Sequence, residues 1–193
     1  MICKSAGDES LGQTKNVIAI TGMPGSGKAV ASSVAREYDI PVFVCGDVVR
    51  DEASVRGISM TPKSLGNLML EMRREEGPRV IVKRLLPKIH MSQSRTVVVE
   101  GIRSLEELNL LRENFKVILL AIHSSPKERF ERLTIRGRSD DPKDLNEFIQ
   151  RDMRELDIGI GHVLALADKH IVNDSTIENF RRQLRRFYEE VIS

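Results

Sequence analysis

Cysteine, aromatic residues and long apolar runs are all scarce in this chain of 193 residues. Two cysteines are too few for a disulfide framework, which favours a reducing compartment. No apolar run approaches the roughly 20 residues that a membrane-spanning helix needs. The first fifteen residues are polar and lack the apolar segment of a signal peptide. We therefore expect a cytoplasmic protein with a disordered tail over residues 1–15 and no membrane association.

The sequence is also poor in the features that bind nucleic acid. It has no tryptophan and two tyrosines for base stacking, and its formal net charge is only +2. The basic residues near the C-terminus have no aromatic residues between them, so we interpret them as a solvated helix face: Arg181, Arg182, Arg185 and Arg186. An RNA-associated NTPase is therefore disfavoured, and we predict no nucleic-acid partner.

Short β-branched runs alternate with longer helical patterns, which is typical of βαβ units and a parallel sheet. Five runs are predicted strands: 17–20, 41–45, 96–100, 116–122 and 170–173. The run at 96–100 is apolar on both faces, as expected of a central parallel strand. The pattern predicts an α/β fold with a five-stranded parallel sheet flanked by helices.

Two long helical stretches interrupt this alternation. Glycine and proline divide the first, within residues 47–90, into two or three helices. The second, within residues 124–167, is divided at Gly137 and again at Gly159 and Gly161. We predict a single domain over residues 16–193 that carries these two stretches as a substrate-binding insert and a lid.

A glycine-rich segment with the pattern GxxxxGK directly follows the first predicted strand and opens a helix. Its glycines let backbone N–H groups face phosphate oxygens, the helix N-terminus adds its dipole, and the lysine neutralises phosphate charge. This is the arrangement of a phosphate-binding P-loop. The predicted phosphate-binding residues are Gly22, Met23, Pro24, Gly25, Ser26, Gly27, Lys28 and Ala29.

Ala29 departs from the usual pattern of this loop. The residue after the lysine is normally Ser or Thr, whose hydroxyl coordinates Mg²⁺. A methyl group cannot do so, and Ser32 and Ser33 lie about one turn further along, too distant to substitute easily. Phosphate binding is expected to persist, so a nucleotide sensor that does not catalyse, or hydrolyses only weakly, stays open beside an enzyme.

Polar residues follow the second and third predicted strands, where ligands bind in open α/β sheets. Asp47 is either a helix N-cap or a substrate contact, and Arg50 could hold a second phosphate bidentately. Glu100 could hold Mg²⁺ through water or orient a hydroxyl nucleophile. The structural alternative is an ion pair between Glu100 and Arg103, the third candidate for substrate binding.

The segment 136–141 contains clustered opposite charges beside a glycine. One interpretation is a solvated loop with internal salt bridges; the other is a lid whose Arg136 and Arg138 close on developing phosphate charge. Arg151 and Arg154 on the following helix could join them. The four histidines lack metal-ligand spacing, so we predict no metal site made by the protein alone.

Five segments taken together resemble the nucleoside monophosphate kinase group and, more closely, the archaeal UPF0200 family of adenylate-kinase-related or dephospho-CoA-kinase-like P-loop proteins. The resemblance runs from about Val17 to the C-terminus. Its carriers are residues 20–28, 46–50, 100–104, 138–143 and 158–168.

The resemblance implies ATP, with Mg²⁺, over residues 22–29 and a second substrate under the helices after Asp47. It implies Arg50 on that substrate's phosphate and places Asn173 and Asp174 in the loop that packs near adenine. Adenylate kinases have Asp-Gly-x-Pro-Arg after the third strand, whereas this chain has Glu-Gly-Ile-Arg, which shifts the arginine by one.

The leading hypothesis is therefore a kinase that transfers the γ-phosphate of ATP to a small, nucleotide-like phosphorylated acceptor, either a nucleoside monophosphate or dephospho-CoA. Its expected catalytic residues are Lys28, Glu100, Arg136 and Arg138. The identity of the acceptor and the oligomeric state stay open.

Overall fold

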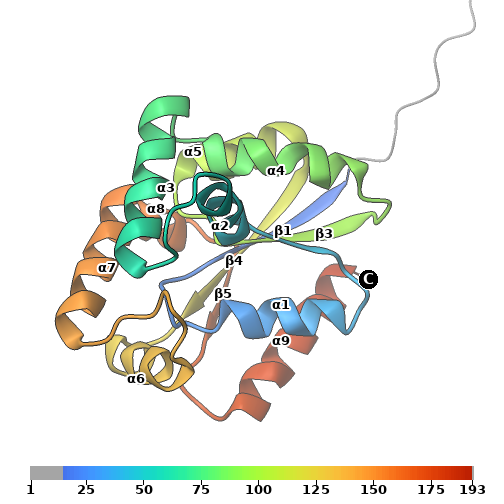
Figure 1. Ribbon diagram of the computed structural model, residues 1–193. Coiled ribbons are helices and arrows are strands. Elements are labelled where there is room, and N and C mark those ends of the chain that lie inside the picture. The colour runs from blue at the N-terminus through green and yellow to red at the C-terminus, as the bar shows by residue number, and fades with distance from the viewer. Residues whose placement is uncertain (1–14, 193) are drawn as a thin grey trace, which may run out of the picture.

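The computed structural model describes residues 15–192 and contains a single five-stranded sheet whose strands are all parallel (Figure 1). The strand order is β2-β3-β1-β4-β5. The strands are β1 (Asn16–Thr21), β2 (Val42–Val44), β3 (Thr96–Glu100), β4 (Lys116–His123) and β5 (Lys169–Val172). The predicted α/β fold with a five-stranded parallel sheet is confirmed.

The central strand β1 shows how the sheet is buried on both faces. It pairs with β3 on one side and with β4 on the other. Val17 and Ala19 face one apolar cluster, and Ile18 and Ile20 face the other. Because successive side chains of a strand point to opposite faces, an unbroken apolar run fills both cores at once.

Helices cover the two faces of the sheet (Figure 1). On one face lie α1 (Lys28–Arg36) and α9 (Ile177–Ile192). On the other lie α2 (Cys45–Val55), α3 (Pro62–Glu76), α4 (Val80–Met91), α5 (Leu105–Asn114) and α8 (Ile160–Ala165). The predicted insert 47–90 therefore includes a helix, α4, whose apolar side is part of the core beneath the sheet.

Two further helices lie beyond the end of the sheet where the phosphate loop begins: α6 (Pro126–Arg136) and α7 (Leu145–Ile158). A capping box formed by Ser125 and Glu128 fixes the start of α6, and the Asp144 side chain caps α7. Gly137 ends α6 in the left-handed conformation, with φ of 57°. The chain therefore reverses where the sequence predicts a hinge.

Three local predictions differ from the structure. Cys45 begins α2 and does not end β2. Gly161 lies inside α8, so only Gly159 separates α7 from α8. Helix α5 was missed, although Ser104 caps it by accepting from the Glu107 N–H, and the Ser-x-x-Glu signature is legible in the sequence.

The predicted disordered tail lies outside the described residues except for Lys15, which donates to the carbonyl oxygens of Ser92 and Ser94 at 2.6 and 2.7 Å. Cys45 is buried, and burial raises the pKa of its thiol. Among the residues that the structure describes, no helix is both long and apolar enough to cross a bilayer.

Helix α9 offers a test of how the phosphate loop is supported. Phe180 is fully buried beneath the loop, whereas Ile177, on the same helix, is 48% exposed. We expect Phe180→Ala to lower the free energy of unfolding by about 3–5 kcal/mol, because the cavity it leaves cannot collapse fully. Ile177→Ala should change it by less than about 0.5 kcal/mol. Denaturant unfolding measures both, and equal values would contradict the packing described.

Candidate functional site

The phosphate loop connects β1 to α1 and is tightly enclosed. At Gly27 φ is 112°, and a Cβ atom there would lie 2.6 Å from Asn173 Nδ2 and 2.9 Å from Phe180 Cε1. Only glycine fits this conformation and this space. The same Asn173 amide donates to the Ser26 carbonyl oxygen at 2.9 Å. The position of the loop is thus determined by residues almost 150 positions away in the chain.

Lys28 begins α1 and is held by the loop itself. Its Nζ donates to the carbonyl oxygens of Gly22 at 2.6 Å and Met23 at 3.1 Å. Burial lowers the pKa of Lys28 to about 8, although the Glu100 carboxylate acts in the opposite direction. An ammonium group that is poorly solvated and bound only to carbonyls is well placed to exchange those partners for phosphate oxygens.

Glu100 lies at the carboxyl end of β3, and its partner is a residue of α1. The buried Ser32 hydroxyl donates a hydrogen bond to Glu100 Oε2. The structural alternative, an ion pair between Glu100 and Arg103, is not formed, because the Arg103 guanidinium turns toward Glu155 of α7. Ser32, which the sequence places too far along the helix to replace the missing hydroxyl at position 29 easily, lines the same cavity as Lys28.

Asp47 and Arg50 form an ion pair on the first turn of α2. Asp47 is the third residue of that helix; Val44 is the N-cap, and no side chain caps the helix. The N-cap interpretation of Asp47 is therefore wrong. Both side chains line the same cavity as Lys28.

Arg103 follows β3 and contacts two helices. Its Nε lies 2.9 Å from Glu155 Oε2 of α7, and its Nη1 lies 2.8 Å from Met69 Sδ of α3. A thioether is a weak acceptor, so one arm of this guanidinium lacks a strong partner.

The lid arginines differ in their contacts. Arg136 pairs bidentately with Asp141, whose carboxylate also accepts from the Arg138 backbone N–H at 2.9 Å. Burial by itself would raise the pKa of Asp141, yet these hydrogen bonds hold that pKa below its usual value. Arg151 of α7 donates to the Asp140 carbonyl oxygen at 2.8 Å. Within residues 15–192 no carboxylate pairs with the Arg138 guanidinium.

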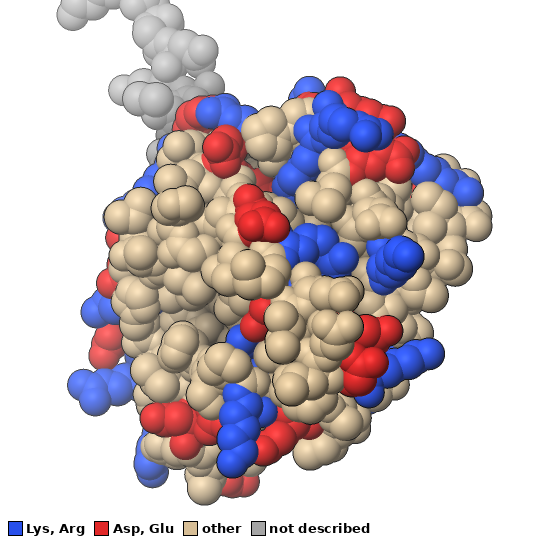
Figure 2. Space-filling model, turned by 90° about the vertical axis from the view of Figure 1, so that its left-hand side faces the viewer, with Lys and Arg blue, Asp and Glu red and all other residues tan. Residues whose placement is uncertain are grey.

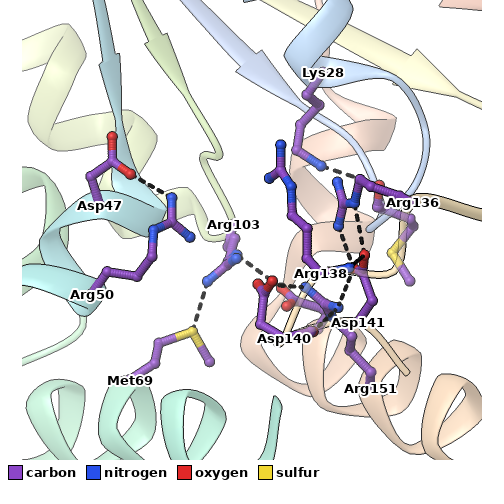
Figure 3. Close-up of polar contacts among 12 residues, drawn as sticks. Lys28, Asp47, Arg50, Met69, Arg103, Arg136, Arg138, Asp140, Asp141 and Arg151 are labelled. Atoms are coloured by element: carbon purple, nitrogen blue, oxygen red, sulfur yellow. Dashed lines mark hydrogen bonds and ion pairs between the residues drawn. The ribbon is translucent and has the colours of Figure 1, made fainter. Parts of the chain in front are cut away.

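A cavity of about 460 Å³ joins these groups at the carboxyl end of the sheet. In Figure 3 Lys28, Arg136 and Arg138 lie on one side of it, Asp47 and Arg50 lie on the other, and Arg103 lies between. The loop contributes Pro24, Gly25, Gly27 and Ala29 to its lining, whereas the Gly22 and Met23 carbonyls hold Lys28. The predicted side chains that line this cavity are Lys28, Asp47, Arg50, Glu100, Arg103, Arg136 and Arg138.

Two arginines of α6 support the site and were missed. The buried Arg129 donates to the Pro24 carbonyl oxygen at 3.1 Å and pairs bidentately with Asp152 of α7. Arg132 lines the cavity and donates to the Asn173 carbonyl oxygen at 2.9 Å. Together with Arg136 they occupy positions three and four apart, which places all three on one helix face. That spacing was the available signal.

The face of the molecule seen in Figure 2 carries charges of both signs. Lysine and arginine are interspersed with aspartate and glutamate there, and no broad field of one sign is seen on it.

Comparison with known proteins identifies the relatives of this chain. A family model described as an AAA domain matches residues 21–150. A UPF0200 protein of Pyrococcus horikoshii is 45% identical over 182 residues, which cover 92% of this chain and 98% of that protein. A UPF0200 protein of Methanocaldococcus jannaschii is 44% identical over 179 residues, covering 92% of this chain and 91% of the other. The chain belongs to the UPF0200 family.

Solved structures show the same fold as this UPF0200 chain. TT1252 from Thermus thermophilus matches with a TM-score of 0.63 at 17% identity, over 92% of this chain and 98% of that one. A shikimate kinase from Acinetobacter baumannii, in complex with shikimate, matches with a TM-score of 0.58 at 15% identity, over 93% of each chain. The chain thus has a P-loop fold of the kinase type.

The low pKa of Lys28 predicts how ATP binding depends on pH. Above pH 8 a growing fraction of the free protein carries a neutral Lys28, whereas bound triphosphate favours the ammonium form. ATP binding should therefore take up protons at pH 9 and weaken as the pH rises from 8 to 10.5. Calorimetry in two buffers of different ionisation enthalpy measures the uptake.

The unfolding equilibrium provides the control. Between pH 8 and 10.5 the unfolded chain binds more protons at this lysine than the folded chain, so Lys28 makes the free energy of unfolding increase with pH. The Lys28→Met variant should lack that increase. Identical pH dependence in the two proteins, or binding at pH 9 without proton uptake, would contradict the account.

Proposed function

We propose that this chain is an ATP-dependent kinase that transfers the γ-phosphate of ATP to a small, nucleotide-like phosphorylated acceptor of the nucleoside monophosphate or dephospho-CoA type. The observation that carries the proposal is the shared cavity. It joins a phosphate loop, Lys28 and the arginines of the lid segment on one side to Arg50 on the other, with Arg103 between them.

Phosphoryl transfer needs alignment and charge neutralisation more than covalent chemistry by the protein. Lys28 and the loop amides hold the triphosphate, and Arg136 and Arg138 offset the charge that develops on the transferred group. Arg50 on the opposite side and Arg103 between the two sides hold the acceptor. Glu100 is positioned to accept the proton of an acceptor hydroxyl or to orient the metal.

Mg²⁺ is the metal that such nucleotide sites typically use. The residues of the cavity could hold it through one carboxylate together with the phosphates of the nucleotide. The described residues contain no cluster of three or more acidic, histidine or cysteine side chains. Mg²⁺ needs no such cluster, because it keeps several waters and is usually held by one or two carboxylates together with substrate phosphates. Glu100 is the candidate carboxylate, and the bound ion would neutralise phosphate charge.

Ser32 provides a hydroxyl group near the position where the hydroxyl usual at position 29 is missing. In P-loop proteins a hydroxyl next to the lysine and an acid at a strand end hold the metal together. Here the acid keeps a hydroxyl neighbour, but that hydroxyl comes from Ser32, one helical turn later. We assign Ser32 the role of positioning the Glu100 carboxylate toward the nucleotide site.

The second candidate function is a nucleotide sensor with little or no turnover. Ala29 favours it, because its methyl group lines the cavity where a metal-binding hydroxyl is normally found. The Ala29→Ser variant separates the candidates. A sensor would gain Mg²⁺-dependent turnover from an undetectable level, whereas a kinase would turn over before the change.

The kinase proposal predicts the behaviour of Lys28→Ala. Phosphoryl transfer from ATP to a panel of monophosphates, followed by phosphorus NMR, should be measurable in the native chain and fall at least about a hundredfold in the variant. Lys116→Ala serves as the control, because Lys116 is an exposed lysine at the opposite end of the sheet. Native turnover that survives Lys28→Ala would exclude the mechanism.

The role of Ser32 is tested by comparing Ser32→Ala with Ser33→Ala, since Ser33 is the exposed neighbour on the same helix. Loss of the Ser32 hydroxyl should weaken the Mg²⁺-dependent part of ATP binding about tenfold and leave Mg²⁺-free binding unchanged. Calorimetric titrations with and without Mg²⁺ measure both parts. If both variants bind as the native chain does, Ser32 has no such role.

A further inference from the structure

A second, smaller cavity of about 60 Å³ lies between α2, α3 and α7, and it adjoins the larger one through shared residues such as Arg50 and Arg103. A water molecule takes up about 30 Å³ in the liquid. The space therefore suits a compact charged group and is too small for a nucleobase. Its polar walls are Arg50, Arg103, Asp140, Arg151, Arg154 and Glu155.

Arg154 is the uncompensated charge of this cavity. Arg50 pairs with Asp47, Arg103 with Glu155, and Arg151 with Asp140. Arg154 is half-buried, and among the described residues it has no hydrogen bond or ion pair. A guanidinium in this setting is stabilised by an incoming oxyanion.

Helix α3 is shaped to admit that guanidinium. Gly66 is buried in α3, and a Cβ atom there would lie 2.5 Å from Arg154 Cζ and 2.6 Å from Arg154 Nη1. The arginine thus lies directly against the helix backbone. Any larger residue at position 66 would displace its side chain from the cavity.

The Glu155 carboxylate is the second group of this cavity that lacks a hydrogen-bond partner, and it calls for a hydrogen-bond donor on the ligand. The residue is only 4% exposed, and its Oε2 has no hydrogen-bond partner within the described residues, although Arg103 Nε lies 2.9 Å away as an ion-pair partner. A buried carboxylate oxygen without a hydrogen bond is unfavourable. The other oxygen, Oε1, also makes no hydrogen bond within the described residues, and Glu155 lines the cavity, so a ligand hydroxyl there can donate to this carboxylate.

We infer that this cavity recognises the charged end of the acceptor, and that the acceptor is a hydroxylated oxyanion: a phosphate or carboxylate with a hydroxyl group close to it. Arg154 binds the oxyanion and Glu155 accepts from the hydroxyl. The inference rests on the proposed function, because it states which chemical groups of that reaction's acceptor the protein recognises.

Matched probes test it. Calorimetry on the native chain, saturated with a non-hydrolysable ATP analogue, compares 2-hydroxyethyl phosphate with ethyl phosphate and lactate with propionate. Each pair differs by one hydroxyl, and we expect about tenfold tighter binding of the hydroxylated member in at least one pair. The pair that responds identifies the oxyanion. Equal binding within both pairs, or no binding of any probe, overturns the inference.

Two variants assign the roles. Glu155→Gln should abolish the preference for the hydroxylated member and tighten binding of the plain one, which a purely structural residue would not do. Gly66→Ala keeps every charge and improves helix propensity, yet it displaces Arg154 and should weaken both members of a pair about tenfold. Retention of native preferences in Glu155→Gln, or of native affinity in Gly66→Ala, contradicts the assignment.

Binding of the ATP analogue separates this inference from the proposed function. Gly66 and Arg154 do not line the larger cavity, so Gly66→Ala should bind the analogue as the native chain does. Glu155 acts electrostatically on Lys28, so its variant does not serve as this control. If the analogue binds and the probes show no preference, the inference fails and the kinase proposal stands. If the native chain does not bind the analogue, the kinase proposal itself fails.

Discussion

The close packing of the phosphate loop against distant parts of the chain is the constraint on which the site depends. Gly27 lies against Asn173 and Phe180, and Arg129 donates to the Pro24 carbonyl oxygen from the other side. These contacts hold the loop open in the absence of ligand. The loop backbone thus needs little rearrangement to receive phosphate, which reduces the entropy that binding must oppose, whereas Lys28 exchanges carbonyl oxygens for phosphate oxygens.

A second theme is that the cations of the site already have partners. Lys28 is bound to carbonyl oxygens, Arg136 to Asp141 and Arg103 to Glu155. Paired charges keep the free protein stable, and ligand oxygens can replace the internal partners one by one. Arg138 and Arg154, which lack such partners among the described residues, are the positions where an anion gains most.

The strands and the phosphate loop could be predicted from the sequence, because both follow from local patterns: an unbroken apolar run, then glycines, then a helix. Side-chain contacts could not be predicted in this way where the possible partners lie far apart in the chain. An ion pair between Glu100 and Arg103 was the structural alternative that the sequence suggested for Glu100, yet Arg103 pairs with Glu155 and Glu100 accepts from Ser32. Helix α5 was missed even though Ser104 and Glu107 provide a local signal.

The central claim is that the loop over residues 22–29 binds a polyphosphate. A crystal structure of the chain with an ATP analogue tests it most directly. The account predicts triphosphate oxygens within hydrogen-bond distance of the N–H groups from Gly25 to Ala29, with Lys28 Nζ moved from the carbonyl oxygens to the phosphates. Triphosphate bound elsewhere, or a loop still empty at saturating analogue, would contradict it.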